Sequence, residues 1–173
     1  TFSALNSLEC QLNYFIQKNL MPDTHMQFLR EAGYLEAGEK RVNFSDRYSA
    51  KMSGTTHDGN FLNAVAESIR KDGVLPEKDW VFDQQNFNWD AYYAEIPQAL
   101  KDKAKKFLDY FLIQWEWITA PSIQNDDQIK QAPIQIATAV CPGWNNQNPI
   151  PACTLQVQHA TMISKVAPDM SAP

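Results

Sequence analysis

The hydrophobic periodicity of this chain changes near residue 111, and no other feature constrains the fold as strongly. Before this point, apolar residues recur at three- and four-residue spacings, as they do along one face of a helix. In residues 111–119, FLIQWEWIT, the side chains alternate with a period of two, and this spacing together with the aromatic content predicts a strand. Further strands are predicted within 133–140 and 153–163, on either side of a loop rich in proline and asparagine.

The part of the chain before residue 111 is predicted to be mainly helical. Residues 2–20 place apolar side chains on one wide helical face, and residues 60–73 repeat this pattern. A further helix is predicted over 99–110, after a proline suited to a first helical turn. A shorter helix is predicted over 25–33, with Thr24 as its N-cap.

Helices first and strands last predict an α+β fold, in one domain that covers residues 1–173. The helical part is expected at about residues 1–110 and the β-rich part at about 111–165. Residues 166–173 are small, polar and rich in proline, which indicates a tail.

The overall composition argues against several functional classes. The chain has 173 residues, of which 44% are hydrophobic, and a net charge of −5, which is typical of an acidic globular domain. No basic stripe is present that would bind nucleic acid, and no run of roughly 18 apolar residues that would span a membrane. We therefore expect neither nucleic acid nor a membrane among the partners.

The three cysteines, Cys10, Cys141 and Cys153, are too few for a disulfide scaffold and match no zinc-binding spacing. No metal or other cofactor is therefore predicted. A bridge between Cys141 and Cys153 and a reduced pair both remain open. Cys10 falls in mid-helix, away from the helix N-terminus that would lower a thiol pKa, so packing is the favoured role for it.

Three local patterns follow one another along the chain. The first, Thr1-Phe2-Ser3-Ala4-Leu5, begins a helix. In the second, Asp58-Gly59-Asn60 opens a helix, Lys71-Asp72-Gly73 ends it, and the aromatic segment Asp79-Trp80-Val81-Phe82 follows. The third is a pair of strands that begin with Ala132-Pro133-Ile134-Gln135-Ile136 and with His159-Ala160-Thr161-Met162-Ile163.

In their order and spacing, these patterns resemble the papain-like cysteine peptidases. The resemblance implies a two-lobed fold, with a helical N-terminal lobe, a β-rich C-terminal lobe and a cleft between them. It also implies that the nucleophilic cysteine lies two positions before Thr1, so we expect the protein to continue upstream of this residue. Gly59 and Asn60 correspond to the substrate-binding turn, in which Asn60 replaces the second glycine of the family.

The same resemblance assigns the role of catalytic base to His159. A cysteine nucleophile needs a neighbouring imidazole, which holds it as a thiolate and later protonates the leaving amine. The alternative is a histidine that simply packs on a half-buried strand. If His159 is the base, we expect its ring in the cleft and within about 12 Å of Thr1, because two or three intervening residues reach no further.

Two other residue types invite functional interpretations. Trp144, in the proline-rich loop, is expected to form a wall of the cleft, whereas Trp115 and Trp117 are expected in the core or at the interface between the lobes. A terminal threonine can act as a nucleophile with its own amine as base, but Thr1 begins a helix rather than the strand on which such enzymes start.

Two functions are compatible with these features. The first is a cysteine peptidase that hydrolyses peptide bonds of a peptide or protein substrate through an acyl-thioester, with His159 as general base. The alternative is a catalytically inactive papain-like domain that serves as a structural or binding module in a larger, virion-like assembly. The intact surroundings of His159 favour the peptidase, and Asn60 in the substrate-binding turn favours the module.

Overall fold

The computed structural model describes residues 2–118 except 37, 39, 83, 84 and 86, together with 133–138 and 159–163, and for 137, 138 and 159–163 it describes the backbone alone. Within these ranges, helices predominate. The elements in chain order are α1 Phe2–Gln17, α2 Asp23–Glu31, α3 Asp46–Met52, α4 Leu62–Asp72, the 3-10 turn η1 Glu77–Asp79, α5 Trp89–Tyr92, α6 Gln98–Lys105, the 3-10 turn η2 Lys106–Asp109, β1 Ile134–Thr138 and β2 His159–Ile163.

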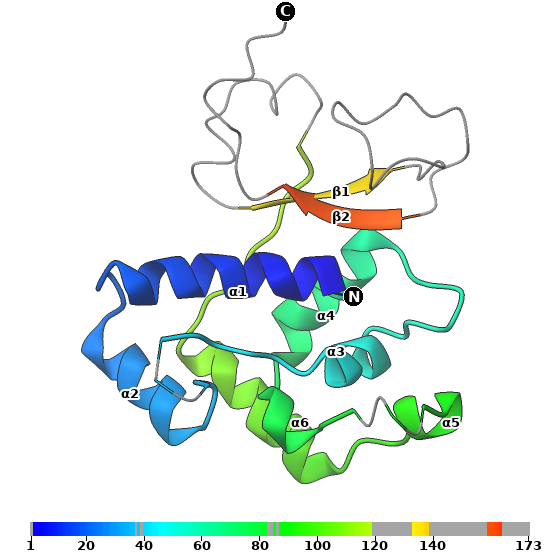
Figure 1. The fold of residues 1–173 in the computed structure, drawn as a ribbon, viewed down its shortest axis with the longest axis horizontal. Coiled ribbons are helices and arrows are strands. Elements are labelled where there is room, and N and C mark those ends of the chain that lie inside the picture. Colours follow the sequence, from blue (N-terminus) through cyan, green and yellow to red (C-terminus); the bar gives the residue numbers. More distant parts are fainter. Residues whose placement is uncertain are drawn as a thin grey trace, which may run out of the picture.

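Helix α1 lies in the middle of the described structure. Its apolar positions recur every three to four residues, so that Leu5, Leu12 and Ile16 fall on one face and are buried. Each such side chain contributes roughly 1.5–3 kcal/mol when it leaves water. Strands β1 and β2 contact α1 on one side, and α4 contacts it as well (Figure 1). The predicted first helix is therefore confirmed.

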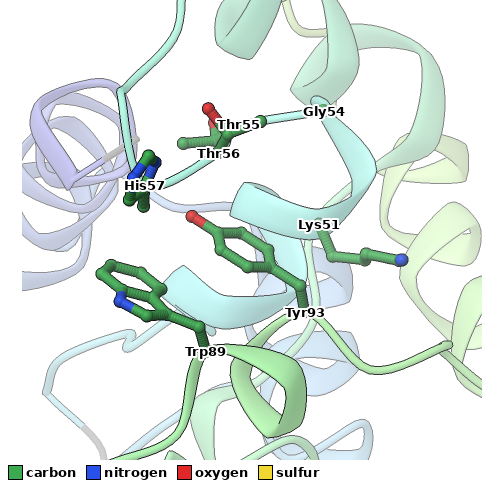
Figure 2. A pocket seen from close by; sticks show the side chains of 7 residues that line it. All are labelled: Lys51, Gly54, Thr55, Thr56, His57, Trp89 and Tyr93. Atoms are coloured by element: carbon green, nitrogen blue, oxygen red, sulfur yellow. The ribbon is translucent and has the colours of Figure 1, made fainter.

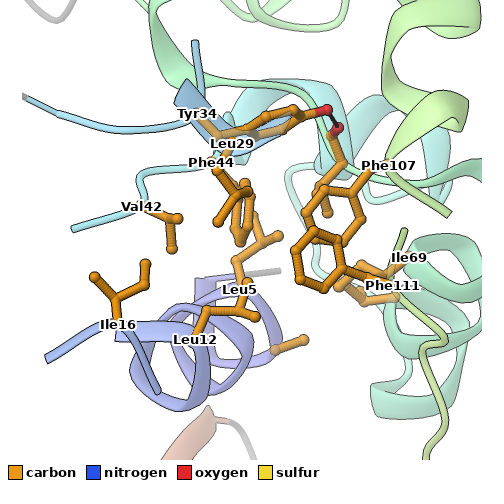
Figure 3. Close-up of a cluster of buried hydrophobic side chains, with 13 residues drawn as sticks. Leu5, Leu12, Ile16, Leu29, Tyr34, Val42, Phe44, Ile69, Phe107 and Phe111 are labelled. Atoms are coloured by element: carbon orange, nitrogen blue, oxygen red, sulfur yellow. Dashed lines mark hydrogen bonds between the residues drawn. The ribbon is translucent and has the colours of Figure 1, made fainter. Parts of the chain in front are cut away.

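The main core joins α1 to segments that are distant in the sequence (Figure 3). Leu29 from α2 and Phe107 from η2 are both fully buried in it. The rings of Phe44 and Phe107 meet edge to face at 5.6 Å, and the Tyr34 ring lies 5.3 Å from Phe107. The buried Tyr34 hydroxyl donates a hydrogen bond of 2.8 Å to the Val74 carbonyl. The polar group of this ring is therefore hydrogen-bonded inside the aromatic core.

Helix α4 ends at a glycine that no other residue could replace without strain. Gly73 has φ +73°, and a Cβ added there would lie 2.0 Å from the carbonyl oxygen of Ala104 in α6. A positive φ and a close backbone approach both favour glycine. The end of the predicted helix at residue 73 is confirmed, and the packing of α6 on this end leaves no room for a side chain there.

One helix start and one whole helix differ from the prediction. Helix α2 begins at Asp23, directly after Pro22. Thr24 therefore lies inside the helix and is not its N-cap, and its hydroxyl is 3.2 Å from the His25 ring. Helix α3 was not predicted because seven residues show little periodicity. Its N-cap is Ser45, whose side chain accepts a hydrogen bond from the Tyr48 N–H.

The predicted fold class is wrong for the residues that the structure describes. They are mostly helical, and the strands among them are β1 and β2, which pair in an antiparallel ribbon of five residues each. These strands lie within the predicted ranges 133–140 and 153–163. A two-stranded ribbon is not a β-rich lobe, however, so the α+β papain-like arrangement of two lobes with a cleft between them is not supported.

The segment 111–118 contains no strand, although its side chains alternate. Phe111 is buried and stacks on Phe107 at 4.4 Å, so the segment begins as part of the helical core. Trp115 and Trp117 are 38% and 68% exposed and contact each other edge to face at 5.9 Å, which corrects their expected place in the core. Alternation makes a strand possible, but a strand also needs a hydrogen-bonded partner.

Candidate active site at the start of helix α1

The first turn of α1 is joined to strand β1 by a direct hydrogen bond. The Gln135 side-chain amide donates to the Ser3 hydroxyl at 2.6 Å, and Ser3 is buried. Gln135 lies opposite Met162 in the ribbon, and Thr138 lies opposite His159. His159 is therefore the first residue of a strand that contacts α1.

The directions of these elements bring the His159 end of the ribbon towards the start of α1. Figure 1 shows β2 beginning near the N-terminal end of α1 and running along the helix in the same direction. His159 lies three positions before Met162, which is about 10 Å along a strand. The backbone of His159 thus lies towards the side from which the chain enters α1.

The electrostatics of the α1 N-terminus suit a negatively charged group. A helix N-terminus carries a partial positive charge and free N–H groups. The first turn of α1 contains no acidic residue that would cancel this field. A thiol placed just before the helix would consequently have its pKa lowered.

The predicted turn at Gly59 and Asn60 forms a tight loop before α4. Thr56 and Gly59 exchange backbone hydrogen bonds, and Gly59 has φ +103°. The Asn60 side chain donates to the Ser53 carbonyl at 2.8 Å and accepts from the Phe61 N–H at 2.7 Å. The Asn60 amide is thus engaged within the protein, and its role in substrate binding stays a prediction.

Several predicted site groups lie outside the described residues. These are Thr1, Trp144, Cys141, Cys153 and the residues of the tail, 166–173. The side chain of His159 is also not described, so the expected distance from its ring to Thr1 stays a prediction. Cys10 is described: it is a half-buried free thiol near the middle of α1.

The structure gathers one group of residues that the sequence did not connect. His57, Trp89 and Tyr93 line a cavity together with residues 51 and 54–56 (Figure 2). The side chain of His57 is 62% exposed and lies beside Asp58. The only sequence signal for the cavity was the high aromatic content of residues 80–93.

Comparisons with known proteins found no match among protein families, curated proteins or solved structures. The resemblance to papain-like peptidases therefore stays a prediction that rests on the three sequence patterns. In the described part of the chain, no helix is long and apolar enough to cross a membrane. Among the same residues, no group of three His, Cys, Asp or Glu side chains could hold a metal ion.

The carboxyl groups of Glu9 and Glu77 both lie close enough to Asp46 to repel its carboxylate. Burial raises the pKa of Glu9, Asp46 and Glu77, and Glu9 and Glu77 each add a repulsion that raises the pKa of Asp46 further, to about 7. Glu9 accepts a hydrogen bond of 2.7 Å from the Phe44 N–H. These carboxyl groups make the stability of the fold dependent on pH.

Replacing Asp46 with asparagine is expected to stabilise the protein near pH 8 and to change little near pH 5. The folded protein holds the Asp46 proton up to about pH 7, whereas the pKa of an aspartate in the unfolded chain is ordinarily 3.8. The free energy of unfolding therefore falls as the pH rises between these values. Since the side chain is partly exposed, we expect a Tm gain of only about 2–4 °C at pH 8.

Thermal unfolding of the Asp46→Asn variant and of the wild type at pH 5 and pH 8 checks this expectation. The exposed Asp109, replaced in the same way, is the control and should change the Tm equally little at both pH values. An Asp46→Asn variant that is less stable than the wild type at pH 8 would contradict the assignment of a half-buried carboxylate that its neighbours repel.

Proposed function

We propose that this chain is part of a cysteine peptidase, in which His159 acts as general base and the nucleophile is a cysteine two positions before Thr1. One observation supports this more than any other. The strand that His159 opens contacts α1 and begins near the N-terminal end of that helix, while Gln135 of the paired strand bonds Ser3 in the first turn. A cysteine just upstream of α1 would therefore lie on the same side of the helix end as the backbone of His159.

The proposed reaction uses the cysteine and His159 in two steps. The thiolate attacks the peptide carbonyl carbon, the C–N bond breaks, and the imidazolium of His159 gives its proton to the leaving amine. Water then attacks the acyl-thioester and gives a proton to His159, so that the acid is released and the thiolate–imidazolium pair is restored. The helix N-terminus of α1 stabilises the thiolate in the resting state.

The test compares this chain with a version extended by its native upstream residues. Both are treated with iodoacetamide at neutral pH, and the modified cysteines are identified by mass spectrometry at successive times. We expect a cysteine two positions before Thr1 to react at least about tenfold faster than Cys10, which lies in mid-helix. In a Cys10→Ser variant of the extended chain, iodoacetamide should label the upstream cysteine at the same rate as in the extended wild type.

Two results would argue against the proposal. The upstream sequence could have another residue at this position, or its cysteine could react no faster than Cys10. If the cysteine is present and reactive but a fluorogenic peptide is not hydrolysed, the alternative of a binding module replaces the peptidase.

A further inference from the structure

A cavity separate from the His159 site lies between two segments that are about 35 residues apart in the sequence. Its volume is about 490 Å³, which is within the range of roughly 300–1,000 Å³ that small-molecule sites occupy. Figure 2 shows the turn at residues 54–57 on one side and the rings of Trp89 and Tyr93 on the other. Neither His159 nor the start of α1 lines it, so the cavity is separate from the proposed nucleophile and base.

The aromatic side of the cavity offers partly uncovered ring faces. The Trp89 and Tyr93 rings are almost parallel, at 8°, with their centroids 5.7 Å apart. This spacing corresponds to an offset stack, in which each ring covers only part of the other. His57 meets Trp89 edge to face at 6.0 Å, and Trp89 is 47% exposed. The two rings therefore form a stepped apolar wall that water can reach in part.

The ionisable side chains beside this wall, Lys51 and His57, each have a carboxylate partner. The Lys51 amine lies 3.7 Å from the Glu95 carboxylate, and the His57 ring nitrogen lies 3.0 Å from the Asp58 carboxylate. A charged ligand would find no unpaired opposite charge on these side chains. The cavity therefore suits a neutral ligand.

Two hydroxyl groups at the cavity remain able to donate hydrogen bonds. Among the described residues, the Tyr93 hydroxyl has no hydrogen-bond partner, and in Figure 2 it points towards His57 and the turn that carries Thr56. The Thr56 hydroxyl accepts a bond of 3.3 Å from the Asp58 N–H, and its own proton is free to bond elsewhere. A purely apolar ligand would cover these hydroxyls without replacing their bonds to water, at a cost in binding energy.

We propose that this cavity binds a sugar ring of a neutral oligosaccharide. The flat C–H face of a pyranose can lie on the wall formed by Trp89 and Tyr93, and its hydroxyl groups can bond to the hydroxyls of Tyr93 and Thr56. An aromatic peptide side chain would use the same wall but would leave both hydroxyls without partners. A neutral sugar therefore fits all three features of the cavity: the aromatic wall, the two hydroxyl groups and the lack of unpaired charge.

The experiment measures binding of three neutral oligosaccharides, namely cellotetraose, maltotetraose and triacetylchitotriose, by saturation-transfer NMR and by titration of tryptophan fluorescence. We expect at least one of them to bind with a Kd of about 1 mM or tighter. Trp89→Ala should weaken this binding at least about tenfold. Tyr93→Phe, which retains the ring, should weaken it about three- to tenfold through loss of the hydroxyl.

Trp117→Ala is the matched control, because it removes an exposed tryptophan that does not line the cavity. Its Kd should stay within about twofold of the wild type. Trp89 also contacts Phe87 and Tyr92, so the Tyr93→Phe variant keeps the test valid if Trp89→Ala unfolds. Absence of binding by all three sugars, or binding that neither cavity variant weakens, would overturn the proposal. Binding of phenylalanine-containing peptides in place of the sugars would overturn the ligand class.

Discussion

Replacing His159 with alanine in the extended protein is expected to lower kcat/KM for a peptide substrate by at least about 1,000-fold. General acid–base catalysis by a positioned histidine contributes roughly 10²–10⁴-fold to the rate. In this reaction the imidazolium also holds the cysteine as a thiolate, so its loss reduces the amount of reactive nucleophile as well. Steady-state kinetics with a fluorogenic peptide give the ratio directly, and the rate of iodoacetamide labelling reports the thiolate separately.

His25 provides the matched control for this substitution. It is the same residue type, and its ring packs on Tyr110 and Phe111 instead of lying in the turn that precedes α4. His25→Ala should leave kcat/KM within about twofold of the wild type. An extended protein that keeps more than about a tenth of its activity without His159 would show that another group is the base.

Replacing Phe107 with alanine is expected to destabilise the fold by about 3–5 kcal/mol. Phe107 is fully buried and lies at the centre of the aromatic core, with its ring 4.4 Å from Phe111 and 5.3 Å from Tyr34. The loss includes the transfer energy of the ring, the cavity that remains and the aromatic contacts. Domains are stable by only about 5–15 kcal/mol, so this one change removes a large part of the total.

Urea denaturation followed by circular dichroism measures this effect as a shift of the unfolding midpoint. Phe61→Ala is the control, because Phe61 is 80% exposed and its truncation should cost less than about 0.5 kcal/mol. Equal midpoints for the two variants would mean that η2 does not pack into the core described above.

The sequence alone was sufficient for the longer helices. Helices α1 and α4 were predicted because their apolar side chains recur with the helical period, and the helix that contains α6 was predicted from the proline before its first turn. Their backbone hydrogen bonds lie within each segment, so local sequence contains most of what is needed to form them. Helix α3 was missed because its stability comes from the Ser45 cap and from burial of Tyr48, a contact that periodicity does not report.

The strands depended on information from outside each segment. Residues 111–118 alternate as a strand would, yet Phe111 packs on Phe107 and no strand forms there. Residues within 133–140 and 153–163 do form strands, because each finds the other as its antiparallel partner on α1. A strand bonds to a neighbour that can lie anywhere in the sequence, so an isolated pattern cannot decide whether it forms.

The same distinction between local patterns and tertiary contacts holds for the candidate sites. The sequence by itself placed Phe2 at the beginning of a helix and His159 within the strand predicted over 153–163, since both positions follow from local patterns. Only the tertiary structure brought that strand against α1, and only it placed Trp89 across from the turn that carries Thr56. Contacts of this kind join residues more than thirty positions apart, and they arise because buried side chains select which segments pack together.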